Sequence, residues 1–182
     1  RPIAMVETLY KLTGRYLLAA HHEVVVEQFP KVQLGVGQAG GSEVAIHTIR
    51  AALQESGELK IILSDDLPNA YNERMRARML RILYNKPELA MFFSFAAMAY
   101  GEPSELLLKG DLGAIVDSIL SANGVKQGDP FALFMFALSV QACFEEADQE
   151  GVTAVAISDD LELVGEPERV FAAYDKVVAM EG

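Results

Sequence analysis

Residues 153–160, Thr-Ala-Val-Ala-Ile-Ser-Asp-Asp, form a short apolar run that ends in two aspartates. Residues 60–66, Lys-Ile-Ile-Leu-Ser-Asp-Asp, show the same pattern earlier in the chain. Ionised carboxylates avoid burial unless they are paired or bind a metal. Two such strand ends side by side would repel each other unless cations lay between them. The two runs therefore predict neighbouring strands whose ends form a two-metal site of the kind used for phosphoryl transfer.

A loop of small residues lies between these two runs. Residues 124–130 read Gly-Val-Lys-Gln-Gly-Asp-Pro and precede a long apolar segment. Gly128 would let the backbone approach a nucleotide or base pair closely, and the Gln127 side chain can donate hydrogen bonds. The loop is therefore a candidate nucleotide or template contact.

Each of these motifs also has a purely structural explanation. Asp66 could cap the helix that follows it, and Tyr71 could be a core residue of that helix. Asp159 and Asp160 could form an ordinary hairpin turn, because Asp tolerates turn geometry well. The loop before residue 131 could simply start a helix. The three motifs together are much less expected by chance than any one alone.

Composition and charge limit the class of protein. The chain has 182 residues, of which 51% are hydrophobic, which suits one domain with a substantial core. A single cysteine, Cys143, excludes an internal disulfide framework and fits a buried residue in a reducing compartment. No apolar run reaches the roughly 18 residues of a membrane span. The net charge of −11 predicts weak, salt-sensitive binding to nucleic acid.

Hydrophobic periodicity and turn residues predict an α+β layout of helices on a small, partly antiparallel sheet. Ser42 is the expected N-cap of the second helix, and the arginines of the third are expected to face solvent. The predicted helices are residues 4–29, 42–55, 69–85, 89–100, 131–147 and 167–180, and the predicted strands are 58–64, 104–109, 114–121, 152–158 and 161–164.

The motifs resemble those of reverse transcriptases, most closely those of non-LTR retrotransposons. The first acidic motif of that family is similar to LSDDLPNAYNER, and its Tyr-x-Asp-Asp motif is similar to AISDDLELVG. Its Gln-Gly-Asp-Pro loop matches SANGVKQGDPFALFMFAL closely. Its Arg-Pro-Ile segment and its glutamine-and-glycine stretch resemble RPIAMVETLYKL and VQLGVGQAGGSE. Ile157 departs from the family pattern, which has an aromatic residue there.

The resemblance implies a polymerase-like palm with a small, mainly antiparallel sheet covered by helices, plus partial fingers and no thumb. It covers residues 1–182 as a single domain that is truncated at both ends. Residues 1–57 would be the partial fingers. Residues 58–182 would be the palm with interleaved helices of the fingers.

The resemblance also implies the activity of an RNA-directed DNA polymerase, which extends a primer 3′-hydroxyl by two-metal nucleotidyl transfer. The cofactor would be two Mg²⁺ ions, with Mn²⁺ as the alternative metal. The partners would be an RNA template, a DNA primer and deoxynucleoside triphosphates, without a membrane, in the nucleus or cytoplasm. Catalysis and metal binding are assigned to Asp66, Asp159 and Asp160, and nucleotide binding to Tyr71, Gln127, Gly128 and Arg1.

Two alternatives remain at this point. A catalytically inactive, palm-like domain could act as a binding or structural module. Residues 35–40 also fit the Gly-x-Gly-x-x-Gly fingerprint of a Rossmann-type dinucleotide-binding enzyme, with acidic residues after the next strand. That fingerprint should follow directly on a strand, whereas the residues before it are predicted to be mainly helical.

Overall fold

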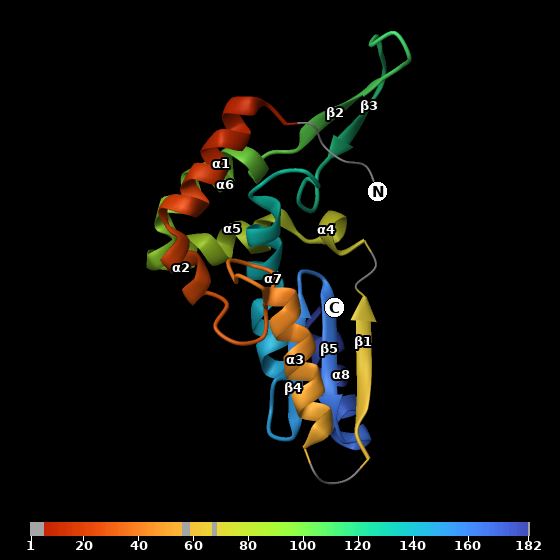
Figure 1. The fold of residues 1–182 in the computed structure, drawn as a ribbon. Coiled ribbons are helices and arrows are strands. Elements are labelled where there is room, and N and C mark those ends of the chain that lie inside the picture. The colour runs from red at the N-terminus through yellow and green to blue at the C-terminus, as the bar shows by residue number, and fades with distance from the viewer. Residues whose placement is uncertain (1–5, 56–58, 67–68, 182) are drawn as a thin grey trace. The chain divides into compact units, whose positions relative to one another are not determined.

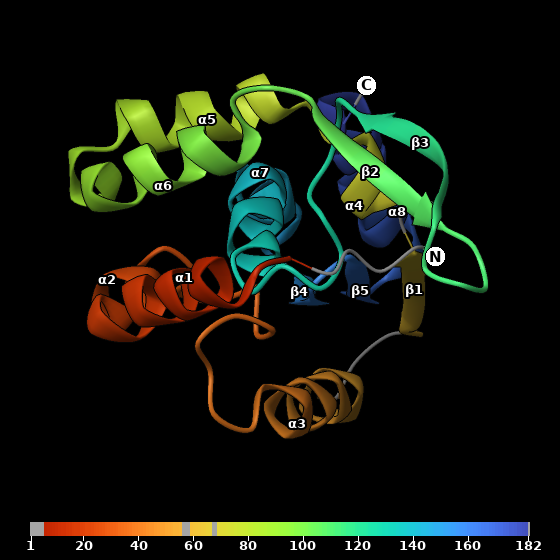
Figure 2. The same cartoon turned by 90° about the horizontal axis from the view of Figure 1, so that it is seen from above.

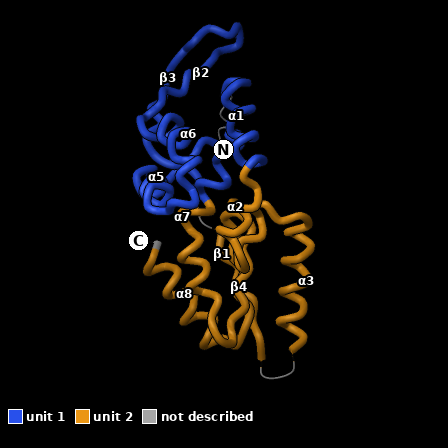
Figure 3. The backbone as a smooth tube through the Cα atoms, turned by 90° about the vertical axis from the view of Figure 1, so that its left-hand side faces the viewer, with its two compact units in different colours: residues 1–20, 69–136 blue, residues 21–68, 137–182 orange. Residues whose placement is uncertain are grey.

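The computed structural model describes residues 6–55, 59–66 and 69–181. The chain divides into two compact units, each built from two separate stretches of sequence (Figure 3). Unit 1 comprises residues 1–20 and 69–136, and unit 2 comprises residues 21–68 and 137–182. Each unit is described by itself below.

Unit 1 is mainly helical and carries one β-hairpin (Figure 1). The hairpin strands β2 and β3 pair antiparallel, with a register shift after Leu108. The apolar side chains of the hairpin are largely exposed, and Leu112 at its tip is 98% exposed. The elements of the unit are α1 (Thr8–Ala20), α4 (Ala70–Glu73), α5 (Arg76–Asn85), the 3-10 helix η1 (Pro87–Leu89), α6 (Ala90–Tyr100), β2 (Ser104–Lys109), β3 (Ile115–Ser121) and the start of α7 (Ala132–Ala147).

Aromatic side chains form the core of unit 1. Phe131, just before α7, and Phe134, in the first turn of α7, both contact Phe92 of α6, with ring centroids 5.8 and 5.0 Å from that of Phe92. Phe131 also meets Phe95 edge to face at 5.2 Å. Such tilted and edge-to-face pairs are the favoured geometry of buried aromatic rings. The sequence predicts a helix over residues 89–100, and the structure shows that this helix belongs to the core.

Unit 2 contains a three-stranded antiparallel sheet in the order β1-β5-β4. Figure 2 shows α3 and α8 on opposite faces of this sheet, and both helices pack against β4 and β5. Leu161, Leu163 and Val164 of the central strand are buried between the two layers. The elements of the unit are α2 (His22–Glu27), α3 (Gly41–Gln54), β1 (Ile61–Asp66), the remainder of α7, β4 (Val152–Ile157), β5 (Asp160–Gly165) and α8 (Pro167–Glu181).

The predicted α+β class, with a small antiparallel sheet and covering helices, is confirmed. Cys143 is buried, as expected. The strands described in the sheet pair antiparallel, whereas a Rossmann enzyme needs a parallel sheet. The only parallel contact among the described residues is a single bridge from Gln33 to Ala156. The division at residue 57 into fingers and palm stays a prediction.

Three local predictions were wrong. The helix expected over residues 4–29 is two helices, which separate at His21. Ser42 is not an N-cap, because Gly40 takes that position with a left-handed backbone at φ 70°. The helix expected over residues 69–85 is interrupted by extended backbone at Arg74, whose carbonyl accepts a hydrogen bond from Gly124 N instead of continuing a helix.

Within the described ranges, no helix combines the length and the apolar character needed to cross a membrane.

Candidate active site

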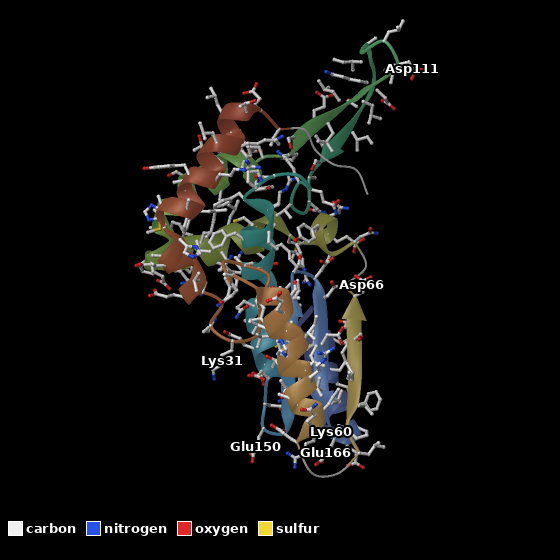
Figure 4. The ribbon with its side chains drawn as sticks, viewed as in Figure 1. Lys31, Lys60, Asp66, Asp111, Glu150 and Glu166 are labelled. Atoms are coloured by element: carbon white, nitrogen blue, oxygen red, sulfur yellow. The ribbon has the colours of Figure 1, made fainter. Side chains whose placement is uncertain are left out.

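Asp66 and Asp160 are cross-strand neighbours in the sheet of unit 2. Asp66 is the last residue of β1 and pairs in register with Asp160, the first residue of β5. Figure 4 labels Asp66 at the end of β1. Directly opposite residues in an antiparallel pair share one face, with Cβ atoms about 4.5–5.5 Å apart. The fold therefore brings two of the three predicted metal ligands to one end and one face of the sheet.

The third predicted ligand, Asp159, lies in the turn between β4 and β5. Ile157 pairs with Asp160, so Ser158 and Asp159 are the two central residues of a tight hairpin. The turn was expected at Asp159-Asp160 and lies one residue earlier. Ser158 has a φ of +62° and Asp159 does not have a positive φ, which is the φ pattern of a type II′ turn. Asp159 thus lies next to Asp160 at the Asp66 end of the sheet.

Asp65 belongs to the other face of the strand. Successive residues of a strand point to opposite faces, so Asp65 cannot share the face of Asp66. Its Oδ1 accepts a hydrogen bond of 3.3 Å from the hydroxyl of Tyr174 on α8. The two adjacent aspartates therefore have different surroundings, and only Asp66 shares a face with Asp160.

The chemistry of these residues suits a hard divalent cation. In the part of the chain that the structure describes, no group of three or more His, Cys, Asp or Glu side chains could hold a metal ion by itself. Mg²⁺ is usually held by one or two carboxylates, with substrate phosphates and water completing its coordination. The Asp66–Asp160 pair supplies the carboxylate oxygens that such a site requires from the protein.

Gln33 contacts the hairpin turn, and the sequence predicts no function for this residue. Its Nε2 donates to Ser158 O at 2.9 Å, and its Oε1 accepts from Ser158 N at 2.8 Å. Oε1 also accepts from Gly35 N at 3.0 Å. The resemblance of residues 32–43 to the family's glutamine-and-glycine stretch was the only sign in the sequence that Gln33 could matter. Its partner, Ser158, lies 125 residues away along the chain, so the contact itself could not be predicted.

In unit 1, the loop over residues 124–130 is held by Arg76. This side chain is only 6% exposed and donates to Gly124 O, Ser121 O and Ser121 Oγ at 2.7–2.8 Å. Burial lowers the pKa of the Arg76 guanidinium. Arg76 was expected to face solvent with its neighbouring arginines, and that prediction was wrong, because three acceptors of the loop lie within its reach.

Two glycines give this loop its path. Gly124 has a φ of +64°, and a Cβ there would lie 2.2 Å from Tyr71 O. Gly128 has a φ of +94° and is exposed. Gln127 beside it is half-buried. The loop is thus fixed at Gly124 and reaches the surface at Gly128, which agrees with either a nucleotide contact or an ordinary helix start.

Asp129 of the same loop is buried and has a structural role. Its Oδ2 accepts hydrogen bonds from the hydroxyls of Tyr10, at 2.7 Å, and of Tyr100. Its Oδ1 accepts from Phe131 N at 2.9 Å and so caps the start of α7. Burial, followed by the contact with Asp129, raises the pKa of both tyrosine hydroxyls. Asp129 therefore already accepts three hydrogen bonds from donors of the protein.

Tyr71 stacks on Phe136 of α7, with ring centroids 4.5 Å apart and planes 10° from parallel. Its carbonyl accepts a hydrogen bond of 2.6 Å from Val125 N. Tyr71, Gln127 and Gly128 thus all belong to unit 1, whereas the three aspartates belong to unit 2. Arg1, the remaining predicted contact, lies outside the described residues.

Comparison with known proteins gives a likeness in structure only. No protein-family model matches the chain, and no curated protein matches it in sequence. The apo telomerase of Candida tropicalis, truncated from its C-terminal domain, superposes with a TM-score of 0.61 at 11% identity over 92% of this chain. The telomerase of Candida albicans, solved with the TWJ fragment of telomeric RNA, gives 0.55 at 11% identity over 94%.

The chain spans only about a third of the length of these two telomerases, 36% and 30% respectively. At such low identity the likeness establishes the fold alone. The chain therefore has a fold like that of these two telomerases.

Proposed function

We propose that this chain is the core of an RNA-directed DNA polymerase of a retroelement, most like those of non-LTR retrotransposons. The observation that carries the proposal is the in-register pair of Asp66 and Asp160, beside Asp159, at one end of an antiparallel sheet. The likeness of the fold to that of a telomerase supports the proposal, because polymerases use paired carboxylates to hold the metal ions of phosphoryl transfer.

In this proposal, Asp66, Asp159 and Asp160 hold two Mg²⁺ ions, with Mn²⁺ as the alternative. The bound ions would supply Lewis-acid chemistry, which lowers the pKa of a primer 3′-hydroxyl and stabilises the charge of the leaving pyrophosphate. The residues would hold the ions through the carboxylate oxygens of Asp66 and Asp160 on one face of the sheet and of Asp159 in the adjoining turn. Tyr71, Gln127, Gly128 and Arg1 would contact the incoming nucleotide or the template.

Nucleic acid is the proposed partner class. One of the two telomerases of similar fold was solved with a TWJ fragment of telomeric RNA, which supports nucleic acid as a partner class for this chain. We propose an RNA template within that class. The net charge of −11 requires that any such binding be local and sensitive to salt. A DNA primer and deoxynucleoside triphosphates complete the proposed substrates.

Primer extension on an RNA template tests this proposal. We expect deoxynucleotide incorporation with Mg²⁺ and its loss in both Asp66→Asn and Asp159→Ala. Asp65→Asn is the matched control, because Asp65 lies on the opposite face and an Asn oxygen can still accept from Tyr174. Equal loss in Asp65→Asn and Asp66→Asn would contradict the assignment of the active face.

An inactive palm-like module is the second candidate, and the acidic net charge favours it. The two candidates differ in metal binding. A polymerase should bind Mn²⁺ through Asp66 and Asp159, as measured by electron paramagnetic resonance. A folded chain without extension activity and without metal binding would favour the inactive module.

A further inference from the structure

We propose that Gln33 is a positioning residue that holds the Ser158-Asp159 turn and thereby sets the orientation of Asp159 toward a bound metal. This inference rests on the proposed function, and the experiment below separates the two. Gln33 itself would touch neither metal nor substrate.

Gln33 is suited to this role because its side-chain amide carries both a hydrogen-bond donor and an acceptor. The side chain is fully buried, at 0% exposure, and donates to Ser158 O while it accepts from Ser158 N. Only an amide side chain offers a donor and an acceptor side by side, so Met or Leu would lose both bonds and Glu would lose the donor. Ser158 O belongs to the peptide group that joins Ser158 to Asp159, so its hydrogen bond fixes the backbone just before Asp159.

The backbone on both sides anchors this contact. Ala156 N donates to Val32 O at 2.8 Å, and Leu34 N donates to Ala156 O at 2.8 Å. Gln33 is thereby paired parallel to the outer edge of β4, two residues before the turn. Main-chain hydrogen bonds therefore fix the position of the Gln33 backbone along β4 relative to Ser158, and these bonds do not depend on the Gln33 side chain.

The turn requires external support because of its backbone conformation. Ser158 has a φ of +62°, and a serine, unlike glycine, is strained in that region. Such residues persist where the surrounding structure over-determines them, and they concentrate at functional sites. The two hydrogen bonds of Gln33 provide that constraint at the residue directly before Asp159.

Gly35 leaves the space that this contact needs. A Cβ at Gly35 would lie 2.9 Å from both Gln33 Oε1 and Ser158 N. Even an alanine would therefore push apart the acceptor and the amide that it binds. The glycine of the glutamine-and-glycine stretch and Gln33 thus act on the same turn.

Mn²⁺ binding to the whole chain, followed by electron paramagnetic resonance, tests the inference. We expect Gln33→Met to raise the Mn²⁺ dissociation constant by about tenfold, the lower end of the usual effect of residues that orient metal ligands. The matched control is Gln141→Met, at a buried glutamine of the same unit whose Nε2 donates to Glu145 Oε1, in its own helix, at 2.8 Å. That control should leave the constant unchanged.

Ser158→Gly provides the second arm. Glycine adopts a positive φ without strain, so the turn should depend less on Gln33, and Gln33→Met should raise the dissociation constant less in the Ser158→Gly background. Where Gln33→Met does not fold, Gly35→Ala disturbs the same contact and should also weaken Mn²⁺ binding. Circular dichroism would confirm that each variant compared is folded.

The outcomes separate the inference from the proposed function. Wild-type binding that depends on Asp159 but is unchanged in both Gln33→Met and Gly35→Ala would overturn the role of Gln33 and leave the proposed function standing. A folded wild type that binds no Mn²⁺ would overturn the proposed function, and the role of Gln33 with it. A weakening that Gln141→Met reproduces would show a general effect of core substitution and would also overturn the inference.

Discussion

The aspartates of the two units differ in what the surrounding protein provides for them. Asp129 in unit 1 is 6% exposed and accepts hydrogen bonds from two tyrosine hydroxyls and one backbone amide. Asp66 and Asp160 in unit 2 are exposed and lie in register as like charges. A buried carboxylate needs such donors, whereas two like charges directly opposite each other on a sheet repel, and a cation between them relieves that repulsion. The same residue type thus stabilises one unit and presents negative charge on the other.

This difference changes how the most specific motif is interpreted. Gln-Gly-Asp-Pro gives the closest match in the resemblance to reverse transcriptases, yet its aspartate caps α7 and binds two phenols. Just before it, Gln127 is half-buried and the backbone of Gly128 is exposed. Specificity of a motif therefore does not show which of its residues meets a ligand.

The largest expected effect is on Asp129. Asp129→Ala should lower the free energy of unfolding by about 3 kcal/mol or more, because it leaves two buried hydroxyls without their acceptor and removes a helix cap. Asp66→Ala should change it by less than about 0.5 kcal/mol, as expected for an exposed site. Urea denaturation followed by circular dichroism measures both. Equal costs would contradict the contrast between the two aspartates.

Arg76 sharpens the same contrast within unit 1. Arg76→Met should lower the free energy of unfolding by about 2 kcal/mol, because three acceptors around Gly124 and Ser121 lose a charged donor. Arg81→Met, an exposed position on the same helix, is the control and should have little effect. Similar losses from both variants, again by urea denaturation, would mean that Arg76 does not hold the loop.

The same comparison shows how far the sequence reaches. Apolar runs that end in aspartates predicted β1 and the β4–β5 hairpin, because strand burial is a local pattern. The pairing of Asp66 with Asp160 could not be derived residue by residue, because register depends on how distant strands align. The prediction named the strand ends, and only the fold shows that Asp65 and Asp66 face opposite sides.

The wrong predictions share a physical reason. Arg76 lies on a helix whose other arginines are more exposed. Its acceptors are about 45 residues away along the chain, and turn and helix patterns in a sequence do not reveal contacts over such a separation. Ser42 is a good capping residue, but Gly40 adopts the left-handed backbone that starts the helix earlier. Local propensity was overruled in both cases by contacts or backbone geometry that a single sequence does not display.

The tyrosines that bind Asp129 predict a pH dependence. Burial and Asp129 raise the pKa of Tyr100, so above about pH 10 the unfolded chain loses this proton while the folded chain keeps it. The stabilisation is complete below pH 10 and is lost as the pH rises. For this buried residue we expect a loss of about 1.4 kcal/mol per pH unit above 10.

Urea denaturation from pH 8 to about pH 11 measures that slope. Tyr100→Phe should reduce it, because phenylalanine has no proton to lose. Tyr16→Phe, at a position that is 68% exposed, is the control and should keep the wild-type slope. Lys126, whose pKa is lowered by burial and by Arg76, remains in all three proteins, so the difference between variants isolates the tyrosine. An unchanged slope in Tyr100→Phe would exclude the tyrosine as its source.

The smallest effect concerns the exposed pair itself. Without metal, Asp66→Asn should raise the free energy of unfolding by about 0.5 kcal/mol at low salt, because it removes a like charge directly opposite Asp160. The gain should fall in about 1 M salt, where charges are screened within about 3 Å. Asp65→Asn, on the other face, should give no such gain. If both variants behave alike, the two carboxylates do not repel each other across β1 and β5, and the reason for expecting a cation between them is lost.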